Sequence, residues 1–325
     1  MEPWLTILKL VGGLGILLLG ADLLVRGATR FAASVGIKPV IIGLTLVAYG
    51  TSAPELSIGV NAALRGDSGI RTGDVIGSNI ANIGLILGLV SLVRPIRFDP
   101  DLFKRDIPAM LTAAVLLGTL PFIGGPRPLG EELVFILHPW IAVLFLALLL
   151  GLQEWMRRSA REGADPPPEN ARSWRRRGLL LLWTLAGLCA LIFGGVVFVQ
   201  GAAGAAAMLG VPQLLIGLTV VAVGTSAPEL ATSLVAAARG QGDIAAGNVV
   251  GSNTFNILLV LGLTSLIAPL PIEVRAMQFD MPVMLGFSVL LVFLTWRRRE
   301  LSRVGGGILL SLYALYIANL FFEWY

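Results

Sequence analysis

The chain contains one pattern twice, as IGLTLVAYGTSAPEL at residues 42–56 and as IGLTVVAVGTSAPEL at residues 216–230. The same offset of 174 residues aligns GSNIANI, which starts at Gly77, with GSNTFNI, which starts at Gly251. Across this region, 28 of 47 aligned positions are identical without a gap. Chance does not produce such agreement, so the chain contains an internal duplication.

The composition places this duplication in a membrane. Of the 325 residues, 56% are apolar and 14% are charged, whereas about a quarter of the residues of a soluble domain are charged. Several apolar runs reach the ~20 residues that a helix needs to cross a bilayer. One cysteine and one histidine exclude a disulfide framework, a Cys/His metal cluster and a Ser/His/Asp triad. We therefore expect an all-α polytopic membrane protein and no enzyme.

Hydropathy predicts ten transmembrane helices, at residues 5–30, 39–64, 70–93, 107–123, 133–156, 178–208, 213–238, 244–268, 280–296 and 305–322. They form an N-terminal half at 1–156 and a C-terminal half at 178–325, joined by a linker at 157–177, with the repeated motif at 43–89 and 217–263. Because each half has five spans, the second half begins on the opposite side of the membrane. Inverted repeats of this kind are typical of secondary transporters, with the substrate site at the repeat interface.

Basic residues predict the orientation, because Lys and Arg collect in cytoplasmic loops. If the arginine-rich linker at 157–177 is cytoplasmic, 19 of the 24 basic residues lie inside and both termini face outward. The formal charge of +4 has the same explanation and does not indicate a nucleic-acid partner. The bilayer is the expected partner, and we expect a monomer.

Two acidic residues, Glu55 and Glu229, fall in the middle of the second and seventh predicted spans. An ionised carboxylate at that depth costs several kcal/mol unless it is paired or solvated, and no basic residue lies at comparable depth. The proline before each glutamate cannot donate a backbone hydrogen bond and disfavours helix at the preceding residue. We therefore predict that the helix unwinds at Ala53 and Ala227 and frees carbonyls for cations. The structural alternative is a neutral or hydrogen-bonded carboxyl group.

Hydroxyl and amide side chains accompany the carboxylates. In the third span Ser78 and Asn82 share one helical face, as Ser252 and Asn256 do in the eighth. These pairs act either as hydrogen bonds between helices or as ligands. Carboxylate, hydroxyl, amide and carbonyl oxygens are hard donors that suit Ca²⁺ and Na⁺. With asparagine at both central positions, the site has a formal charge of −2.

Glycine is abundant, with 39 residues. The pairs Gly73/Gly77 and Gly247/Gly251 predict small-residue stripes that let the third and eighth spans approach the broken helices closely. The first and sixth spans are also rich in small residues, but they contain no motif of the GTSAPEL kind. These two spans are therefore candidates for the moving part.

The doubled and inverted motifs GTSAPEL and GSNxxNI resemble the repeats of the cation/Ca²⁺ exchanger superfamily, in particular its prokaryotic sodium/calcium exchanger branch. The resemblance covers all ten spans. It implies antiport of about three Na⁺ for one Ca²⁺ by alternating access, with the first and sixth spans sliding over a static core. It also implies a multi-pass protein of a prokaryotic inner membrane, with transported Ca²⁺ and Na⁺ and no cofactor.

The resemblance also implies roles for particular residues. Glu55 and Glu229 would bind Ca²⁺ and Na⁺, Thr51 and Thr225 would supply oxygens to Ca²⁺, Ser52, Ser226, Ser78 and Ser252 would complete the Na⁺ sites, the carbonyls of Ala48 and Ala222 would contribute to them, and Asn82 and Asn256 would line the centre. Some relatives have aspartate at the position of Asn256, so dependence on a proton or K⁺ is weakened here. Three Na⁺ on a −2 site carry one net charge, which predicts electrogenic exchange.

Other functions remain open from the sequence. A Ca²⁺/H⁺ antiporter of the same fold would transport Ca²⁺ in response to a pH gradient without Na⁺. A cation channel could use similar ligands, although the inverted duplication favours alternating access. An intramembrane hydrolase with paired carboxylates is disfavoured, because no nucleophile and base accompany the acids.

Overall fold

The computed structural model describes residues 3–65, 71–129, 132–160, 173–210 and 222–322. In this part of the chain eight helices are long and apolar enough to cross a membrane, and a bent pair of helices adds a ninth. Most predicted spans are therefore confirmed. The span predicted at 213–238 begins outside the described residues and is seen only from Ala222 onward.

The N-terminal half contains short helical pieces as well as long helices. Its elements are α1 (Pro3–Val35), α2 (Pro39–Ile42), η1 (Gly43–Val47), α3 (Ala48–Thr51), α4 (Ala53–Leu64), α5 (Arg71–Ala81), η2 (Asn82–Leu87), α6 (Gly88–Val93), β1 (Ile96–Arg97), η3 (Leu102–Asp106), α7 (Ile107–Thr119), η4 (Leu120–Gly124), β2 (Arg127–Leu129), β3 (Glu132–Leu137) and α8 (Pro139–Ser159).

In its described residues the C-terminal half follows a similar order. Its elements are α9 (Trp174–Met208), α11 (Ala222–Thr225), α12 (Ala227–Ala238), α13 (Gly242–Phe255), η7 (Asn256–Leu261), α14 (Gly262–Ile267), β4 (Leu270–Glu273), η8 (Ala276–Asp280), α15 (Met281–Thr295), β5 (Glu300–Leu301) and α16 (Arg303–Phe322). The π-helical turns η2 and η7 begin at Asn82 and Asn256, which occupy equivalent positions in the two halves. Such turns are rare and often mark functional sites.

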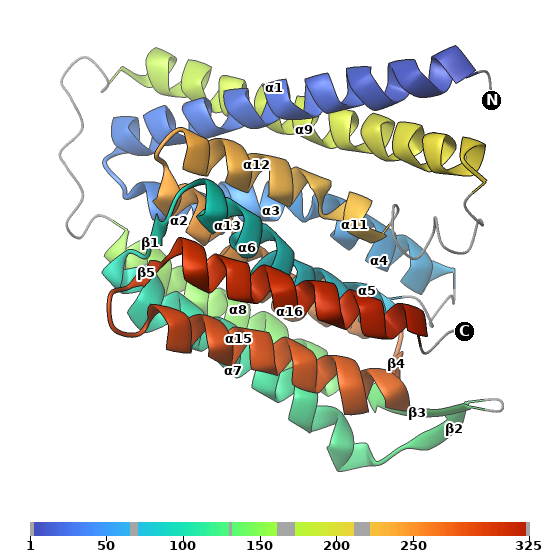
Figure 1. Cartoon of the computed structure of the whole chain (residues 1–325). Helices are drawn as coiled ribbons and strands as arrows, with labels where there is room; N and C mark the ends of the chain where they lie inside the picture. The colour runs from blue at the N-terminus through green and yellow to red at the C-terminus, as the bar shows by residue number, and fades with distance from the viewer. Residues whose placement is uncertain (1–2, 66–70, 130–131, 161–172, 211–221, 323–325) are drawn as a thin grey trace.

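Equivalent helices of the two halves run in opposite directions. In Figure 1, α1 runs from right to left and α9 from left to right, and α8 and α16 are opposed in the same way. The start of α1 and the end of α16 lie at one end of the bundle, called the terminal end below. The end of α8 and the start of α9 lie at the other, called the linker end. The arrangement is that of the predicted inverted repeat.

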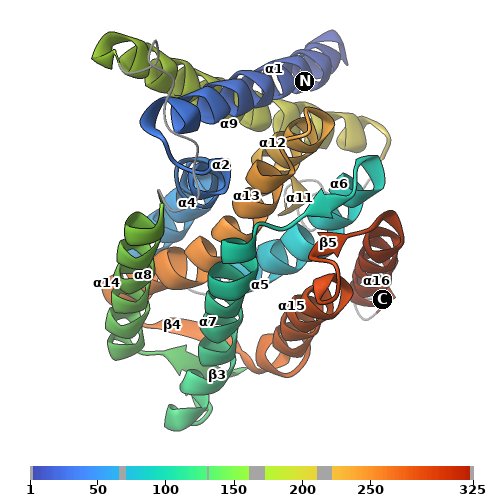
Figure 2. The same cartoon turned by 90° about the vertical axis from the view of Figure 1, so that its left-hand side faces the viewer.

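The paired helices α1 and α9 form a separate layer across the bundle (Figure 2). They pack through glycines spaced seven residues apart: Gly13, Gly20 and Gly27 on α1, and Gly187, Gly194 and Gly201 on α9. A Cβ atom added to Gly20 would lie 2.4 Å from the Leu191 backbone nitrogen, and one added to Gly194 would lie 2.4 Å from that of Leu17. Positions 20 and 17 on α1 correspond to 194 and 191 on α9, so the contact has internal two-fold symmetry.

Short strands correct one predicted boundary. The fifth span begins at Pro139 rather than at residue 133, because residues 132–137 form β3. This strand pairs with β2 and with β4 of the other half, and β1 pairs with β5 at the linker end (Figure 1). Pro139 explains the boundary, since proline is tolerated in the first turn of a helix and rarely further in. The fourth span also starts earlier than predicted, at Leu102.

The predicted cytoplasmic basic groups gather at the linker end. The Arg177 Nε donates to the Ser34 carbonyl at 3.0 Å, and Arg97 pairs with Glu300 at 3.0 Å. Arg157 and Arg158 both pair with Glu154. The linker at 157–177 lies largely outside the described residues. The clustering agrees with the prediction that both termini share one side of the membrane, and which side is outside stays a prediction.

Candidate ion-binding site

Each motif glutamate lies just after a break in its helix. A single serine separates the helical pieces, with φ and ψ of −87° and 7° at Ser52 and of −86° and 7° at Ser226. The two helical pieces around Ser52 are bent by 44°. The predicted break at Ala53 and Ala227 is therefore wrong by one residue. Each alanine starts the next helix, because the proline that follows it occupies the first turn, where no backbone donor is needed.

The glutamates face different surroundings. Glu229 is buried, with 1% of its surface exposed, and its Oε1 accepts a hydrogen bond from the Ser52 hydroxyl at 3.0 Å. Glu55 is half-buried. The Oε2 atoms of both residues are buried and have no hydrogen-bond partner in the described part of the chain. The contact between Ser52 and Glu229 joins the two halves at the site.

Thr51 and Asn248 extend this contact between the halves. The Thr51 hydroxyl lies 3.3 Å from the Ala48 carbonyl and 3.2 Å from Asn248 Oδ1, and its single proton can be shared between them. The Asn248 amide nitrogen donates to Ser233 Oγ at 3.0 Å and to the Glu229 carbonyl at 3.4 Å. Asn248 thus supports the backbone beside Glu229, a role that the sequence analysis missed.

A second network connects the third and eighth spans. The Asn79 amide donates to the Asn253 carbonyl at 3.3 Å, and the Asn253 amide donates to the Asn79 carbonyl at 3.2 Å. Asn82 Nδ2 donates to Asn253 Oδ1 at 2.8 Å, and Asn256 Nδ2 donates to Ser78 Oγ and Asn79 Oδ1 at 3.1 and 3.3 Å. The amide nitrogens of Asn82 and Asn256 are therefore occupied, and their oxygens remain available.

Five buried oxygens of the predicted site residues have no hydrogen-bond partner within the described residues. They are Glu55 Oε2, Glu229 Oε2, Asn82 Oδ1, Asn256 Oδ1 and Ser252 Oγ. An unpartnered buried polar atom costs roughly 1–3 kcal/mol, and these atoms come from residues of both halves. In the described ranges no three or more His, Cys, Asp or Glu side chains lie close enough together to hold one metal ion. The available ligand set is therefore two carboxylates surrounded by neutral hard oxygens, which fits Na⁺ or Ca²⁺.

The remaining predicted residues lie at the second break. Ser226 is buried and occupies the junction that Ser52 occupies in the first half. Thr225 ends α11, and Ala222 begins it. Residues 211–221 lie outside the described part of the chain, so the predicted contributions of the Ala222 carbonyl and of Thr225 stay predictions.

The structure describes the contacts of one of the two predicted glycine stripes. A Cβ added to Gly247 would lie 2.8 Å from the Val40 carbonyl oxygen, and one added to Gly251 would lie 2.7 Å from Ala48 Cβ. The close approach predicted for the eighth span is therefore confirmed. For Gly73 and Gly77 no such contact is described, because most of the equivalent segment, residues 211–221, lies outside the described part of the chain, so this stripe stays a prediction.

The two glutamates also differ in how their helices are covered. Helix α1 packs along α12, on which Thr232 and Ser233 are buried. At the equivalent place on α4, Ile58 is exposed. An ion pair between Asp22 of α1 and Arg239, which follows α12, holds the covered side together. The structure thus covers the half of the site that faces the linker end and leaves the half that faces the terminal end more exposed.

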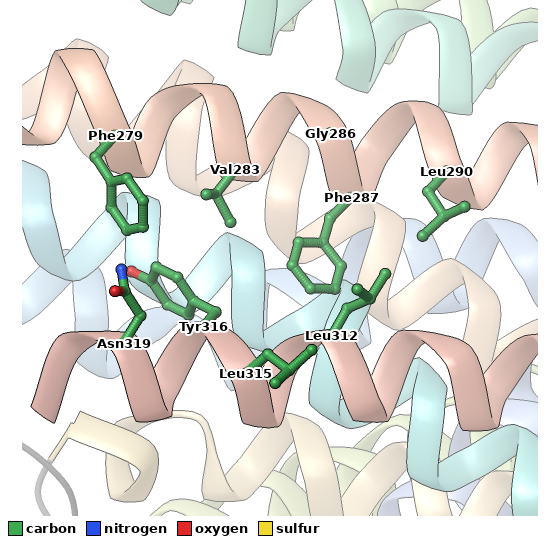
Figure 3. Close-up of a pocket in the computed structure, with 9 residues that line it drawn as sticks. All are labelled: Phe279, Val283, Gly286, Phe287, Leu290, Leu312, Leu315, Tyr316 and Asn319. Atoms are coloured by element: carbon green, nitrogen blue, oxygen red, sulfur yellow. The ribbon is translucent and has the colours of Figure 1, made fainter. Parts of the chain in front are cut away.

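A separate groove between α15 and α16 does not resemble an ion site. It has a volume of about 460 Å³ and is lined mainly by apolar side chains, among them Phe279, Phe287 and Leu312 (Figure 3). Its polar groups are the Tyr316 hydroxyl, which donates to Asp280 at 3.0 Å, and the Asn319 amide. Among the described residues no carboxylate lines it, so it offers a cation far less than the network around the glutamates.

Three asparagines of the site, Asn79, Asn253 and Asn248, were not among the residues predicted from the sequence, and they differ in how far the repeat could have indicated them. Asn79 and Asn253 occur at the same position in both copies of the GSN motif, and the inverted symmetry alone would pair them. Asn248 is harder to find, because its repeat partner is Asp74. Only the structure reveals the contacts that distinguish this position.

Comparison with known proteins agrees with this geometry. The family model described as "Sodium/calcium exchanger protein" matches residues 5–153 and 179–322. The inner membrane protein YrbG of Escherichia coli is 38% identical over 307 residues, covering 93% of this chain and 92% of that protein. The sodium/calcium exchanger MaX1 of Methanosarcina acetivorans is 34% identical over 343 residues, covering 97% of this chain and 98% of that protein.

A solved structure gives the same result. The sodium-calcium exchanger NCX_Mj, soaked with 10 mM Na⁺ and no Ca²⁺, matches with a TM-score of 0.84 and 31% sequence identity, over 98% of this chain and all of that one. The family-model match, the near full-length relatives and the shared fold lead to one conclusion. The chain is a multi-pass membrane protein that belongs to the sodium/calcium exchanger family.

Proposed function

We propose that the chain is a secondary antiporter that exchanges Na⁺ for Ca²⁺ at the site between Glu55 and Glu229. The observation that carries this proposal is the set of five buried oxygens without hydrogen-bond partners. Two of them belong to carboxylates, two to amides and one to a hydroxyl. A bound cation would satisfy all five and offset the repulsion between the two acids.

The ligand roles follow the sequence prediction. In this proposal the two glutamates bind both ions, and Thr51 and Thr225 add oxygens to Ca²⁺. The Na⁺ sites are completed by the hydroxyls of Ser52, Ser226, Ser78 and Ser252 and by the carbonyls of Ala48 and Ala222. The centre of the site is lined by Asn82 and Asn256. The Ser52 hydroxyl already holds Glu229 at 3.0 Å. A Na⁺ ion bound by this serine would therefore compete for the same carboxylate as Ca²⁺.

We take the number of three Na⁺ per Ca²⁺ from the family resemblance, since two Na⁺ would also neutralise the site, and the charge of the site then sets the charge moved per cycle. One Ca²⁺ neutralises two carboxylates, whereas three Na⁺ leave one positive charge. Exchange of three Na⁺ for one Ca²⁺ would then move one charge across the membrane per cycle. That charge is worth about 2.3 kcal/mol per 100 mV, so the membrane potential would contribute to the driving force.

Alternating access would use the separate layer of α1 and α9. This layer packs against α12 on one side of the site, and α1 and α9 are in close contact through their glycines, so in this proposal they would move as one unit. Sliding of this layer toward α4 would cover Glu55 and uncover Glu229. A disulfide engineered between α1 and α12 should therefore stop exchange, and undiminished transport after cross-linking would contradict the sliding step.

We further propose a location in a prokaryotic inner membrane, with the terminal end outside and the linker end in the cytoplasm. The relative from Escherichia coli is named an inner membrane protein. The arginines at the linker end agree with the preference of Lys and Arg for cytoplasmic loops. In this orientation the more exposed half of the site faces outward.

The experiment that tests the function is ⁴⁵Ca²⁺ uptake into proteoliposomes that hold an outward gradient of Na⁺, of K⁺ or of protons. Wild-type protein should take up Ca²⁺ only with the Na⁺ gradient, and Glu55→Gln and Glu229→Gln should each abolish uptake. Uptake driven by protons alone would instead identify a Ca²⁺/H⁺ antiporter. A flux that ignores every counter-ion gradient would identify a channel.

A further inference from the structure

The inverted repeat is broken at one polar position near the ion site. Asp74 in the N-terminal half corresponds to Asn248 in the C-terminal half. Asp74, Ser78 and Asn82 are spaced four residues apart along α5 and the start of η2, so they share a helical face. Asp74 thus adds a third carboxylate one helical turn from a predicted ligand. It lies in the first turn of α5, and α5 begins toward the terminal end (Figure 1).

Asn248 shows what this position does when it is neutral. It is fully buried, and its amide donates to the Glu229 carbonyl and to Ser233 Oγ. A carboxylate has no N–H group and cannot make these bonds. The residue that corresponds to Ser233 is Gly59, which has no hydroxyl. Asp74 therefore cannot act as the structural bridge that Asn248 provides.

The surroundings of Asp74 are those of an exposed charge. Asp74 is exposed, whereas Asn248 has 0% of its surface exposed. Helix α5, which carries Asp74, packs against α4, which carries Glu55. Glu55 is also the less covered glutamate, and its Oε2 has no hydrogen-bond partner within the described residues. A negative charge at this place raises the local concentration of cations beside Glu55.

We propose that Asp74 is a specificity-determining residue that attracts Ca²⁺ to the site from the terminal end and favours it over Na⁺. This inference rests on the proposed Na⁺/Ca²⁺ exchange. Because the corresponding position toward the linker end is the neutral Asn248, the attraction acts on one side of the membrane only. The two faces of an otherwise symmetric site would therefore differ in apparent affinity for Ca²⁺.

The charge also predicts how selectivity changes. An electrostatic free energy scales with the charge of the ion. Removal of Asp74 should therefore change the binding free energy of a divalent ion about twice as much as that of a monovalent ion. Charged clefts change the local concentration of ions by tenfold or more. For this exposed carboxylate we expect a three- to tenfold rise in the KM for Ca²⁺. The KM for Na⁺ should rise by about the square root of that factor, roughly two- to threefold.

The test compares right-side-out and inside-out membrane vesicles that contain wild-type protein, Asp74→Asn or Asp74→Glu. Asp74→Asn should raise the KM for Ca²⁺ presented at the terminal end three- to tenfold, leave kcat within about twofold, and leave the KM from the linker end unchanged. Asp74→Glu should restore most of the lost affinity. The matched control is Glu273→Gln, which removes the exposed charge of the last residue of β4, a strand at the terminal end (Figure 1). It should change neither KM.

The outcomes separate this inference from the function on which it rests. Equal KM changes from both sides, a fall in kcat alone, or no change would overturn the role of Asp74. If Glu55→Gln is inactive in the same vesicles, exchange at the glutamates still stands. If wild-type vesicles show no Ca²⁺ flux coupled to Na⁺, the proposed function itself fails.

Discussion

Replacement of Asn253 by alanine should destabilise the protein, because this side chain links the two halves in the centre of the fold. The substitution removes the bond from Asn253 Nδ2 to the Asn79 carbonyl and the bond from Asn82 Nδ2 to Asn253 Oδ1, at 3.2 and 2.8 Å. Asn82 is 1% exposed, so its amide nitrogen would stay buried without this partner.

The magnitude follows from these two bonds. Leaving a buried donor or acceptor unsatisfied costs roughly 1–3 kcal/mol, while hydrogen bonds between transmembrane helices average about 0.6 kcal/mol when other partners can replace them. Here the surrounding amides are already engaged with each other, so replacement is limited. We therefore expect a loss of about 2–4 kcal/mol in the free energy of unfolding.

Thermal unfolding of purified protein in detergent measures this loss. A change of 1 kcal/mol shifts the Tm of a domain of 150–250 residues by roughly 2–4 °C, so Asn253→Ala should lower the Tm by about 5–10 °C. Asn79→Ala, the equivalent change in the other half, should have a similar effect. Asn61→Ala is the control, because Asn61 is exposed and bonds only within its own helix.

A Tm for Asn253→Ala within about 1 °C of the wild-type value would refute this reasoning. A large effect of Asn253→Ala with none for Asn79→Ala would contradict the two-fold symmetry of the network. Calcium binding offers a second readout. Once its amide nitrogen loses its partner, Asn82 can rotate, and the affinity for Ca²⁺ should fall in the variants that remain folded.

Three further predictions concern the moving layer and the glutamates. Gly20→Leu should abolish transport and lower the Tm by several degrees, because the new side chain forces α1 away from α9. The control is Gly15→Leu, whose side chain would point into open space and should be tolerated. Uptake of ⁴⁵Ca²⁺ and thermal unfolding measure both variants. Asp22→Asn removes the partner of Arg239. It should increase the labelling of a cysteine placed on the linker-end side of the site by roughly two- to fivefold, since an ion pair of this exposure is worth about 1 kcal/mol or less. Unchanged labelling would exclude a role of this ion pair in closing that side. Ca²⁺ at 100 times its Kd should stabilise wild-type protein by about 2.7 kcal/mol and should leave the Tm of Glu229→Gln unchanged. Equal stabilisation of both proteins would place the Ca²⁺ site elsewhere.

Much of the architecture was predictable because the duplication carries strong constraints. An identical motif in two halves of five spans required inversion, and the structure has equivalent helices in opposite directions. The prolines indicated broken helices, although the break lies at Ser52 rather than Ala53. The strand β3 was missed because Glu132–Leu137 is apolar enough to extend the hydropathy of the span that follows it.

The site was predictable in its residue types and less so in its contacts. Glu55 and Glu229 were evident from their depth, and both occur at the broken helices. The sequence alone could not reveal that the Ser52 hydroxyl reaches across to Glu229, because that contact depends on the tertiary packing of two segments 177 residues apart. The unequal covering of the two glutamates depends on the position of α1 and α9, which no motif encodes.

The most direct test of the account is equilibrium binding of ⁴⁵Ca²⁺ to the purified protein over a range of Na⁺ concentrations. We predict one Ca²⁺ per chain, complete displacement by Na⁺ with a cooperative dependence on Na⁺ concentration, and no binding by Glu229→Gln. Simultaneous binding of Ca²⁺ and saturating Na⁺, or Ca²⁺ binding by Glu229→Gln equal to that of wild type, would contradict a single site shared by both ions.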